Sequence, residues 1–194
     1  MARAKLSRIP AQTQDWPGAQ ADLHPAPDHG ETSWTPRARL TGRRALITGG
    51  DSGIGRAVAV LFALEGADVA IGFLPEESND AAETQRLVEQ AGRRCVLLPG
   101  DLRTHEANVK LARDAASELG GVDILVCNAA YQMATHEDLE DFPPLQIERT
   151  FATNVFSTFW LTQELADVLP EGGSVLVTTS IQAYSPSEPL LDYA

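Results

Sequence analysis

The stretch RRALITGGDSGIG, residues 43–55, decides the fold of this chain. A largely apolar run ends in a loop with four glycines, and a helical pattern follows directly. In such a loop Gly49 permits a tight turn, Gly53 lets the backbone approach a pyrophosphate, and Gly55 lets helix and strand pack closely. The first turn of the helix presents N–H groups to an anion. The stretch predicts a nucleotide-binding loop, although a glycine turn that only joins two elements has the same local pattern.

The same alternation of apolar runs and helical patterns continues to the end of the chain. We expect strands at 43–48, 68–73, 94–98, 123–128 and 174–180, and helices at 53–65, 78–91, 105–119 and 145–168. These strands are apolar on both faces, so each needs a helix layer above and below it. The pattern predicts a Rossmann-type, doubly wound α/β domain over residues 41–194, with a parallel sheet whose first and fourth strands lie together at the centre.

Residues 1–40 differ in composition from the rest of the chain. They contain five prolines and show no hydrophobic periodicity, which is typical of an extended arm. Trp16 and Trp34 are large apolar side chains that would pack on a surface if one were offered. We therefore expect a proline-rich arm, and both an extended and a packed arm stay open.

Charge and cysteine content limit the partners and the compartment. The net charge is −12, and residues 45–194 carry 8 Lys and Arg against 23 Asp and Glu. Such a surface repels nucleic acid and anionic lipid, so we expect neither as a partner. Cys95 and Cys127 lie in apolar runs, which favours reduced core thiols and a cytoplasmic location. The four histidines show no ligand spacing, so we expect surface positions and no metal site: His24, His29, His105 and His136.

Several motifs follow the glycine loop in a fixed order. Gly100-Asp101-Leu102 follows the third strand, Cys127-Asn128-Ala129-Ala130 follows the fourth, Asn154 lies in the long helix, and Ser180 and Tyr193 come last. Together with TGGDSGIG, this order resembles the short-chain dehydrogenase/reductase family over residues 43–194. The run from Ser180 to Ala194 is similar to a bacterial NADP-dependent aldehyde-reductase-like subgroup that also carries an N-terminal arm.

The resemblance implies a role for each matching residue. It assigns cofactor contacts to Gly49, Gly53 and Gly55 and to the loop residues between them, Asp51, Ser52 and Ile54. It places Asp101 at the adenine ring with Leu102 beside it, and Asn128 near the adenosine ribose. From the local sequence alone, the alternative for Asp101 is a turn or helix-entry residue after Gly100.

The cofactor is expected to be NADP or NAD. At the end of the second strand, residues 72–74 provide neither an acid that would select NAD nor an arginine that would bind a 2′-phosphate. Ser52 and Arg56 would favour NADP, whereas three acids would disfavour it: Asp51, Glu76 and Glu77. The subgroup resemblance favours NADP, and the residues alone leave both open.

The implied reaction interconverts a small carbonyl compound and its alcohol by hydride transfer, with Tyr193 as the acid/base. Ser180 would bind the carbonyl oxygen, and Asn154 would hold a water near a lysine four positions after the tyrosine. The alternative for Asn154 is a helix residue satisfied by backbone. A phenol has a pKa of about 10 and needs positive charge nearby to work near neutrality.

That lysine position lies beyond Ala194, so we expect a C-terminally truncated chain. Residues 174–180 would then be an edge strand with an uncovered apolar face, and the homo-oligomeric assembly of full-length family members would be in doubt. Two alternatives to an active oxidoreductase stay open: a product that binds dinucleotide without turnover, and a chain that does not fold stably. The order of Ser180 and Tyr193 disfavours a Rossmann-type methyltransferase.

Overall fold

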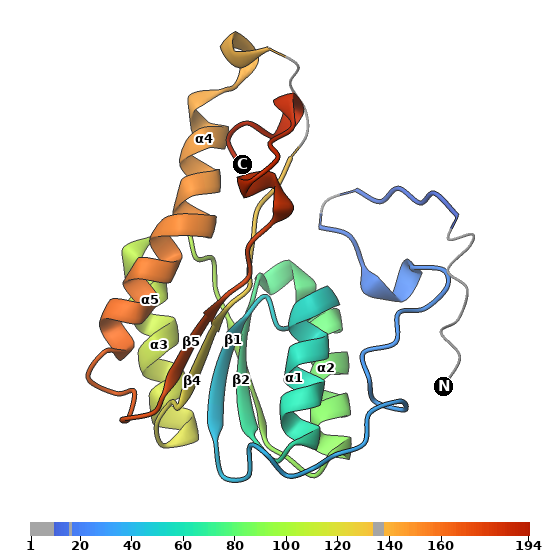
Figure 1. The fold of residues 1–194 in the computed structure, drawn as a ribbon, viewed down its shortest axis with the longest axis vertical. Helices are drawn as coiled ribbons and strands as arrows, with labels where there is room; N and C mark the ends of the chain where they lie inside the picture. The colour runs from blue at the N-terminus through green and yellow to red at the C-terminus, as the bar shows by residue number, and fades with distance from the viewer. Residues whose placement is uncertain (1–9, 16, 134–137) are drawn as a thin grey trace.

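The structure, a computed structural model, describes residues 10–15, 17–133 and 138–194. Its centre is a five-stranded parallel sheet in the order β3-β2-β1-β4-β5 (Figure 1). The strands are β1 (Arg44–Thr48), β2 (Asp68–Phe73), β3 (Cys95–Pro99), β4 (Ile124–Cys127) and β5 (Ser174–Val177). Ala45 lies beside Val69 on one side and Ile124 on the other, so β1 and β4 are neighbours at the centre. The predicted doubly wound α/β fold is confirmed.

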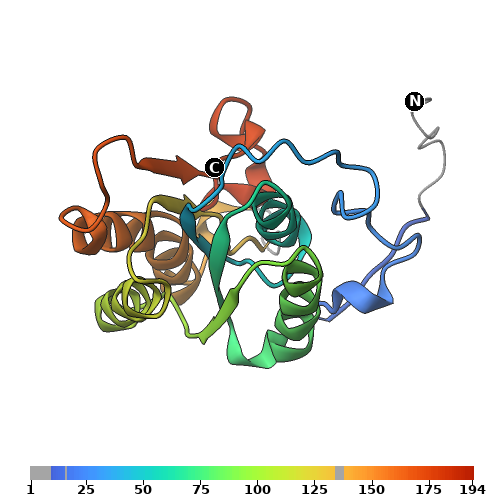
Figure 2. The ribbon, with the colours of Figure 1, turned by 90° about the horizontal axis from the view of Figure 1, so that it is seen from below.

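Helices cover both faces of the sheet (Figure 2). On one face lie α1 (Gly53–Leu64) and α2 (Ser78–Gln90), and on the other lie α3 (His105–Leu119) and α5 (Ser157–Leu165). Successive strand residues point to opposite faces, so Ile47 packs into the cluster under α1 and Leu46 into the cluster under α3 and α5. Both are completely buried, which explains why the apolar runs of the sequence do not alternate with polar residues.

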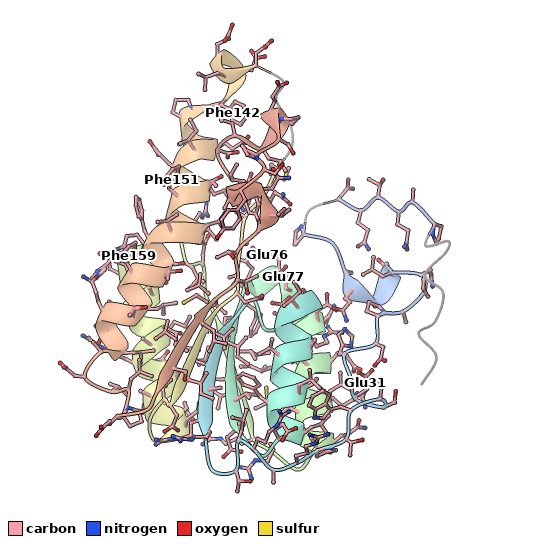
Figure 3. All side chains as sticks on the ribbon, viewed as in Figure 1. Glu31, Glu76, Glu77, Phe142, Phe151 and Phe159 are labelled. Carbon is pink, nitrogen blue, oxygen red and sulfur yellow. The ribbon has the colours of Figure 1, made fainter. Side chains whose placement is uncertain are left out.

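The long helix before β5 contains an interruption that the periodicity does not predict. It consists of α4 (Pro144–Phe151), a π-helical segment, η4 (Ala152–Phe156), and α5. A π segment shifts the faces of a helix and often occurs at a functional site. Figure 3 shows Phe151 and Phe159 on the outer side of this helix, pointing away from the sheet.

The remaining short elements are 3₁₀-helices. They are η1 (Gln20–Asp22), η2 (Pro75–Glu77), η3 (Leu139–Asp141), η5 (Ile181–Ala183) and η6 (Glu188–Leu190). Within the described residues, no helix combines the length and apolar character needed to cross a membrane.

The fifth strand is shorter than expected and lies at an edge of the sheet. It ends at Val177 rather than at Ser180, although the N–H of Thr178 still donates to the carbonyl of Cys127 at 2.9 Å. Val175, Leu176 and Val177 are 43%, 45% and 48% exposed. The expected uncovered apolar edge is therefore present in the structure.

One buried carboxylate provides several of the hydrogen bonds between the arm and the domain. Glu65 follows α1, and its oxygens accept hydrogen bonds from Trp34 Nε1 at 2.8 Å and from Arg39 Nη2 at 3.0 Å. The backbone N–H groups of Arg37 and Arg39 donate to the same carboxylate. These bonds hold the pKa of Glu65 at about 2, with the Arg39 side chain the largest cause. The described part of the arm is thus docked, while Trp16 lies outside the described residues.

One histidine of the arm contradicts the expectation of surface positions. His29 is buried, and its Nε2 lies 2.7 Å from Nε2 of Gln20. His24 and His105 are exposed as expected, and His136 lies outside the described residues. Cys95 and Cys127 are buried free thiols, as the sequence predicts. The histidine prediction was wrong because a polar partner from the same arm makes burial of an imidazole acceptable.

Candidate functional site

The glycine loop between β1 and α1 is constrained at Gly49, Gly53 and Gly55, either by backbone conformation or by close contact. Gly49 and Gly53 have φ angles of +62° and +52°, in the region that favours glycine. A Cβ on Gly55 would lie 1.8 Å from the carbonyl oxygen of Gly49, which is backbone and cannot move aside. A Cβ on Gly53 would meet nothing within 4 Å. The loop is therefore tightly packed on the side of Gly55 and open on the side of Gly53.

A cavity of about 390 Å³ lies at the carboxyl edge of the sheet, and the open side of the glycine loop faces this cavity. Most of the site residues predicted from the sequence line it: Gly49, Asp51, Ser52, Gly53, Ile54, Asp101, Leu102, Asn128 and Tyr193. Gly55, Asn154 and Ser180 do not line it, and Gly55 instead supports the loop from within. The carboxyl edge of a doubly wound sheet, where neighbouring crossovers diverge, is the usual place for a ligand.

Thr48 and Asn128 tie the ends of β1 and β4 together below the cavity. Thr48 Oγ1 accepts hydrogen bonds from the backbone N–H groups of Asn128 and Ala129, both at 3.0 Å. The side-chain amide of Asn128 donates to the carbonyl of Gly49 at 3.2 Å and accepts from Thr178 Oγ1 at 3.0 Å. Asn128 thus links the glycine loop to the end of β5. The sequence prediction missed both threonines, whose only signal is their position at the end of a strand.

Two carboxyl groups beside the loop carry unusual pKa values. Burial raises the pKa of Asp51, and its Oδ2 is buried without a hydrogen-bond partner among the described residues. Burial and the charge of Asp51 raise the pKa of Glu77 to about 7. Figure 3 places Glu76 and Glu77 near the carboxyl edge of the sheet, beside the C-terminal segment. An unsatisfied buried carboxylate oxygen next to an open cavity is suited to accept a hydroxyl hydrogen from a ligand.

Asp101 has the geometry of a turn residue as well as a position in the cavity wall. Its Oδ1 accepts from the backbone N–H of Arg103 at 3.0 Å, and its Oδ2 forms an ion pair with the Arg103 guanidinium. The hydrogen bonds from Arg103 lower the pKa of Asp101 despite its partial burial. Leu102 is buried beside it. Both readings of Asp101 from the sequence are therefore compatible with its position.

Asn154 lies in the π segment, and both polar atoms of its amide bond to one residue of the loop after β4. Its Oδ1 accepts from the N–H of Tyr131 at 2.7 Å, and its Nδ2 donates to the carbonyl of Tyr131 at 2.9 Å. The Arg149 guanidinium lies 4.1 Å from the centre of the Tyr131 ring. In this structure Asn154 is a residue satisfied by backbone, and it fixes a wall of the cavity.

The C-terminal segment brings Tyr193 to the cavity but leaves Ser180 aside. Asp192 Oδ2 accepts from Thr150 Oγ1 at 2.6 Å and from Gln146 Nε2 at 3.2 Å, so the segment is anchored on α4. Ser180 Oγ accepts from the N–H of Gln182 at 3.2 Å and caps η5. The sequence prediction missed Asp192, because its partners are more than 40 positions away.

Arg56 cannot serve a 2′-phosphate, in contrast to the expectation from the sequence. Its side chain is 5% exposed and pairs with Asp80 at 3.1 Å inside the domain. Its Nε also donates to the carbonyl of Asp51 at 2.8 Å and to Thr84 Oγ1 at 2.9 Å. Of the two residues expected to favour NADP, only Ser52 faces the cavity.

No metal site was expected, and the part of the chain that the structure describes contains no group of three or more His, Cys, Asp or Glu side chains arranged to hold a metal ion.

Comparison with known proteins identifies the family. The family model described as short chain dehydrogenase matches residues 43–194. The oxidoreductase YhxD of Bacillus subtilis is 50% identical over 186 residues, which cover 96% of this chain and 62% of that protein. The oxidoreductase YghA of Escherichia coli is 50% identical over 185 residues, 95% of this chain and 63% of that protein. The chain thus spans less than two thirds of the length of these relatives.

A solved structure agrees with the sequence relatives. A short chain dehydrogenase from Burkholderia cenocepacia in complex with NADP superposes with a TM-score of 0.75 at 34% identity, covering 80% of this chain and 62% of that one. Residues 43–194, which the family model matches, include the glycine loop, the whole sheet and the cavity described above. The chain therefore belongs to the short-chain dehydrogenase family.

Proposed function

We propose that the chain binds NADP or NAD at the glycine loop and belongs to an oxidoreductase that interconverts a small carbonyl compound and its alcohol. The observation that carries the proposal is one cavity of about 390 Å³ that contains both the open side of the glycine loop and Tyr193. A bound nicotinamide dinucleotide supplies or accepts the hydride in such a reaction.

The residues around the loop fit a dinucleotide. The first turn of α1 presents N–H groups that lack intrahelical partners, and these N–H groups together with the helix dipole suit a pyrophosphate. The unpartnered Oδ2 of Asp51 is suited to accept a hydrogen bond from a ribose hydroxyl. Leu102 and Asp101 line the cavity with one apolar and one polar side chain, which suit the adenine base. Asn128 holds the loop in place through the carbonyl of Gly49.

Tyr193 is proposed as the acid/base. It lines the cavity, and the hydrogen bonds of Asp192 to α4 hold the backbone beside it. Ser180 is proposed to orient the substrate oxygen, which requires its hydroxyl to turn from the N–H of Gln182 toward the cavity. Asn154 is proposed as a positioning residue, since it fixes Tyr131 in the cavity wall.

NADP is the proposed cofactor, with NAD as the alternative. The support for NADP is the Burkholderia cenocepacia relative, whose structure contains it. Against it stand the buried position of Arg56 and the carboxyl groups of Asp51 and Glu77 in the cavity wall. The pKa of about 7 reduces the charge of Glu77 near neutrality, which lowers the repulsion of a 2′-phosphate.

A second candidate is a chain that binds dinucleotide without turnover. Its support is the position of Ser180, outside the cavity wall and engaged as a helix cap, together with the exposed edge strand β5. In this case binding would be normal and carbonyl reduction absent.

Titration and turnover assays distinguish these functions. We expect saturable binding of NADP to the full chain, measured by calorimetry, weaker binding of NAD, and NADPH oxidation in the presence of small aldehydes. Binding without NADPH oxidation would favour the second candidate. Absence of binding by both dinucleotides in a cooperatively folded chain would contradict the proposal.

The proposed setting follows from composition. Both cysteines are buried free thiols, which supports a cytoplasmic location. The acidic residues 45–194 support small molecules rather than nucleic acid or membrane as partners. We propose that homo-oligomers require parts of the family fold other than those described.

A further inference from the structure

Gln20 of the arm reaches the glycine loop from a distant part of the sequence. It lies in η1 and is only 6% exposed. Its side-chain Oε1 accepts a hydrogen bond from the N–H of Gly53 at 2.5 Å, and its backbone N–H donates to Asp80 Oδ2 at 2.9 Å. A residue of the arm thus contacts both the nucleotide loop and α2.

The orientation of the Gln20 amide is set from two sides. Because Oε1 faces the N–H of Gly53, Nε2 carries the hydrogens and must donate to His29 Nε2, 2.7 Å away. In this contact His29 Nε2 is the acceptor. Both side chains are buried, and the opposite orientation would place the amide hydrogens of Gln20 against the N–H of Gly53, so that two donors faced each other.

The contact with Asp80 joins Gln20 to a buried network that ends in the same loop. Asp80 Oδ1 pairs with Arg56 Nη2 at 3.1 Å, and Arg56 Nε donates to the carbonyl of Asp51 at 2.8 Å. Thr84 Oγ1 donates to that carbonyl as well, at 2.7 Å. The network therefore fixes the backbone before Ser52 through the carbonyl of Asp51, and Gln20 fixes the backbone after Ser52 through the N–H of Gly53.

The loop does not supply this support itself. Ser52 is the N-cap of α1, yet its side chain makes no capping hydrogen bond. A Ser at this position usually accepts a hydrogen bond from an N–H of the first turn. Here the acceptor for the first N–H comes from Gln20, which leaves the N–H groups of Ile54 and Gly55 for an anion. Gly53 also has the flexibility of a glycine at φ +52°, so an unsupported loop would sample other conformations.

We propose that Gln20 is a positioning residue for dinucleotide binding, through which the docked arm holds the glycine loop in its binding conformation. The proposal rests on the proposed function, because it concerns the same loop and ligand. A loop ordered before binding loses less conformational freedom when the ligand arrives, so its affinity is higher. The arm is then part of the cofactor site although it does not line the cavity.

The test compares two substitutions of the same type within the arm. Gln20→Met keeps the length of the side chain and removes the amide, which is both the acceptor for Gly53 and the donor to His29. Gln12→Met is the control, because Gln12 bonds only to backbone groups of His24, at 2.7 Å, among the contacts the structure describes for it. Binding of NADP and NAD is measured by calorimetry, and amide exchange of residues 49–55 is followed by mass spectrometry without ligand.

We expect Gln20→Met to weaken NADP binding about tenfold, the effect of roughly one lost hydrogen bond on the ordered loop. Exchange in residues 49–55 should become faster, whereas Gln12→Met should leave binding and exchange in this segment unchanged. If the wild type binds normally and Gln20→Met leaves both affinity and exchange unchanged, this inference is overturned, whereas the proposed function stands. Failure of the wild type to bind either dinucleotide would overturn the proposed function, and this inference with it.

Discussion

The glycine loop and the C-terminal segment face the same cavity but are held in place in different ways. Around the loop, Thr48, Asp51 and Gly55 are buried, and several independent hydrogen bonds fix the backbone. The C-terminal segment is largely exposed, and the anchor of Tyr193 is its neighbour Asp192 on α4. Dinucleotide binding should therefore depend on the interior of the domain, and turnover on a few surface contacts. Substitutions in the two regions should separate these properties.

The largest expected effect is on turnover alone. Tyr193→Phe removes the hydroxyl that would transfer the proton, and we expect the rate of carbonyl reduction to fall about 10²- to 10⁴-fold. The NADP Kd should stay within about twofold, since the ring and the loop are unchanged. Steady-state NADPH oxidation and calorimetry measure the two quantities. A fall in affinity as large as the fall in rate would remove the distinction between the two regions.

A second change disturbs the interior below the loop. Thr48→Val keeps the shape of the side chain but leaves the N–H groups of Asn128 and Ala129 without their acceptor. We expect the free energy of unfolding to fall by about 1–3 kcal/mol. Thr41→Val is the control, because the hydroxyl of Thr41 is exposed and bonds only to the carbonyl of Ala38 among the contacts described. Urea unfolding that shows equal losses in both variants would contradict the account of the loop.

A third change tests the charge of the cavity. Burial and the neighbouring Asp51, Asp80 and Glu76 raise the pKa of Glu77 from 4.5 to about 7. The protonated form is favoured in the folded chain, so negative charge appears as the pH rises through 7. NADP affinity should then fall about fivefold between about pH 6 and pH 8, and Glu77→Gln should remove this dependence. Glu106→Gln, at an exposed position of α3, changes the net charge by the same amount and should retain the pH dependence.

The smallest expected effect concerns the arm. The pKa of Glu65 is lowered from 4.5 to about 2, first by the hydrogen bond from Arg39. The contribution of the Glu65 carboxylate to the free energy of unfolding is therefore complete above about pH 4.5 and is lost as the pH falls toward 2. Thermal melting should show wild type more stable than Glu65→Gln at pH 6, with the difference shrinking toward pH 3. A difference independent of pH would show that the carboxylate charge does not hold the arm.

The sequence predicts the sheet and the glycine loop because these depend on local patterns, whereas the family resemblance supplies the other predicted residues of the cavity wall: Asp101, Leu102, Asn128 and Tyr193. The apolar runs of β1 and β4 require cover on both faces, and right-handed crossovers with the usual strand order of this fold place the two strands side by side, as observed. The glycines at 49, 53 and 55 have conformations or contacts that other residues cannot adopt. Each of these constraints can be recognised within one short segment of the sequence.

Other features depend on partners that are distant in sequence. Arg56 was expected to favour NADP, but Asp80 and Thr84 hold it in the interior. His29 was expected at the surface, but Gln20 gives it a buried partner. Asn154 lies in a π segment and bonds to Tyr131 in the loop after β4, and helical periodicity reveals neither feature. Long-range polar pairs of this kind decide where a side chain points.

Dinucleotide binding by Gly55→Ala tests the central claim most directly. A Cβ on Gly55 would lie 1.8 Å from the carbonyl oxygen of Gly49, whereas a Cβ on Gly92, whose φ is +77°, would meet nothing within 4 Å. We predict that Gly55→Ala weakens NADP binding at least about 100-fold, because the loop must change shape, and that Gly92→Ala costs about 1 kcal/mol of stability without affecting the Kd. A folded Gly55→Ala chain that binds NADP as tightly as the wild type would contradict the account.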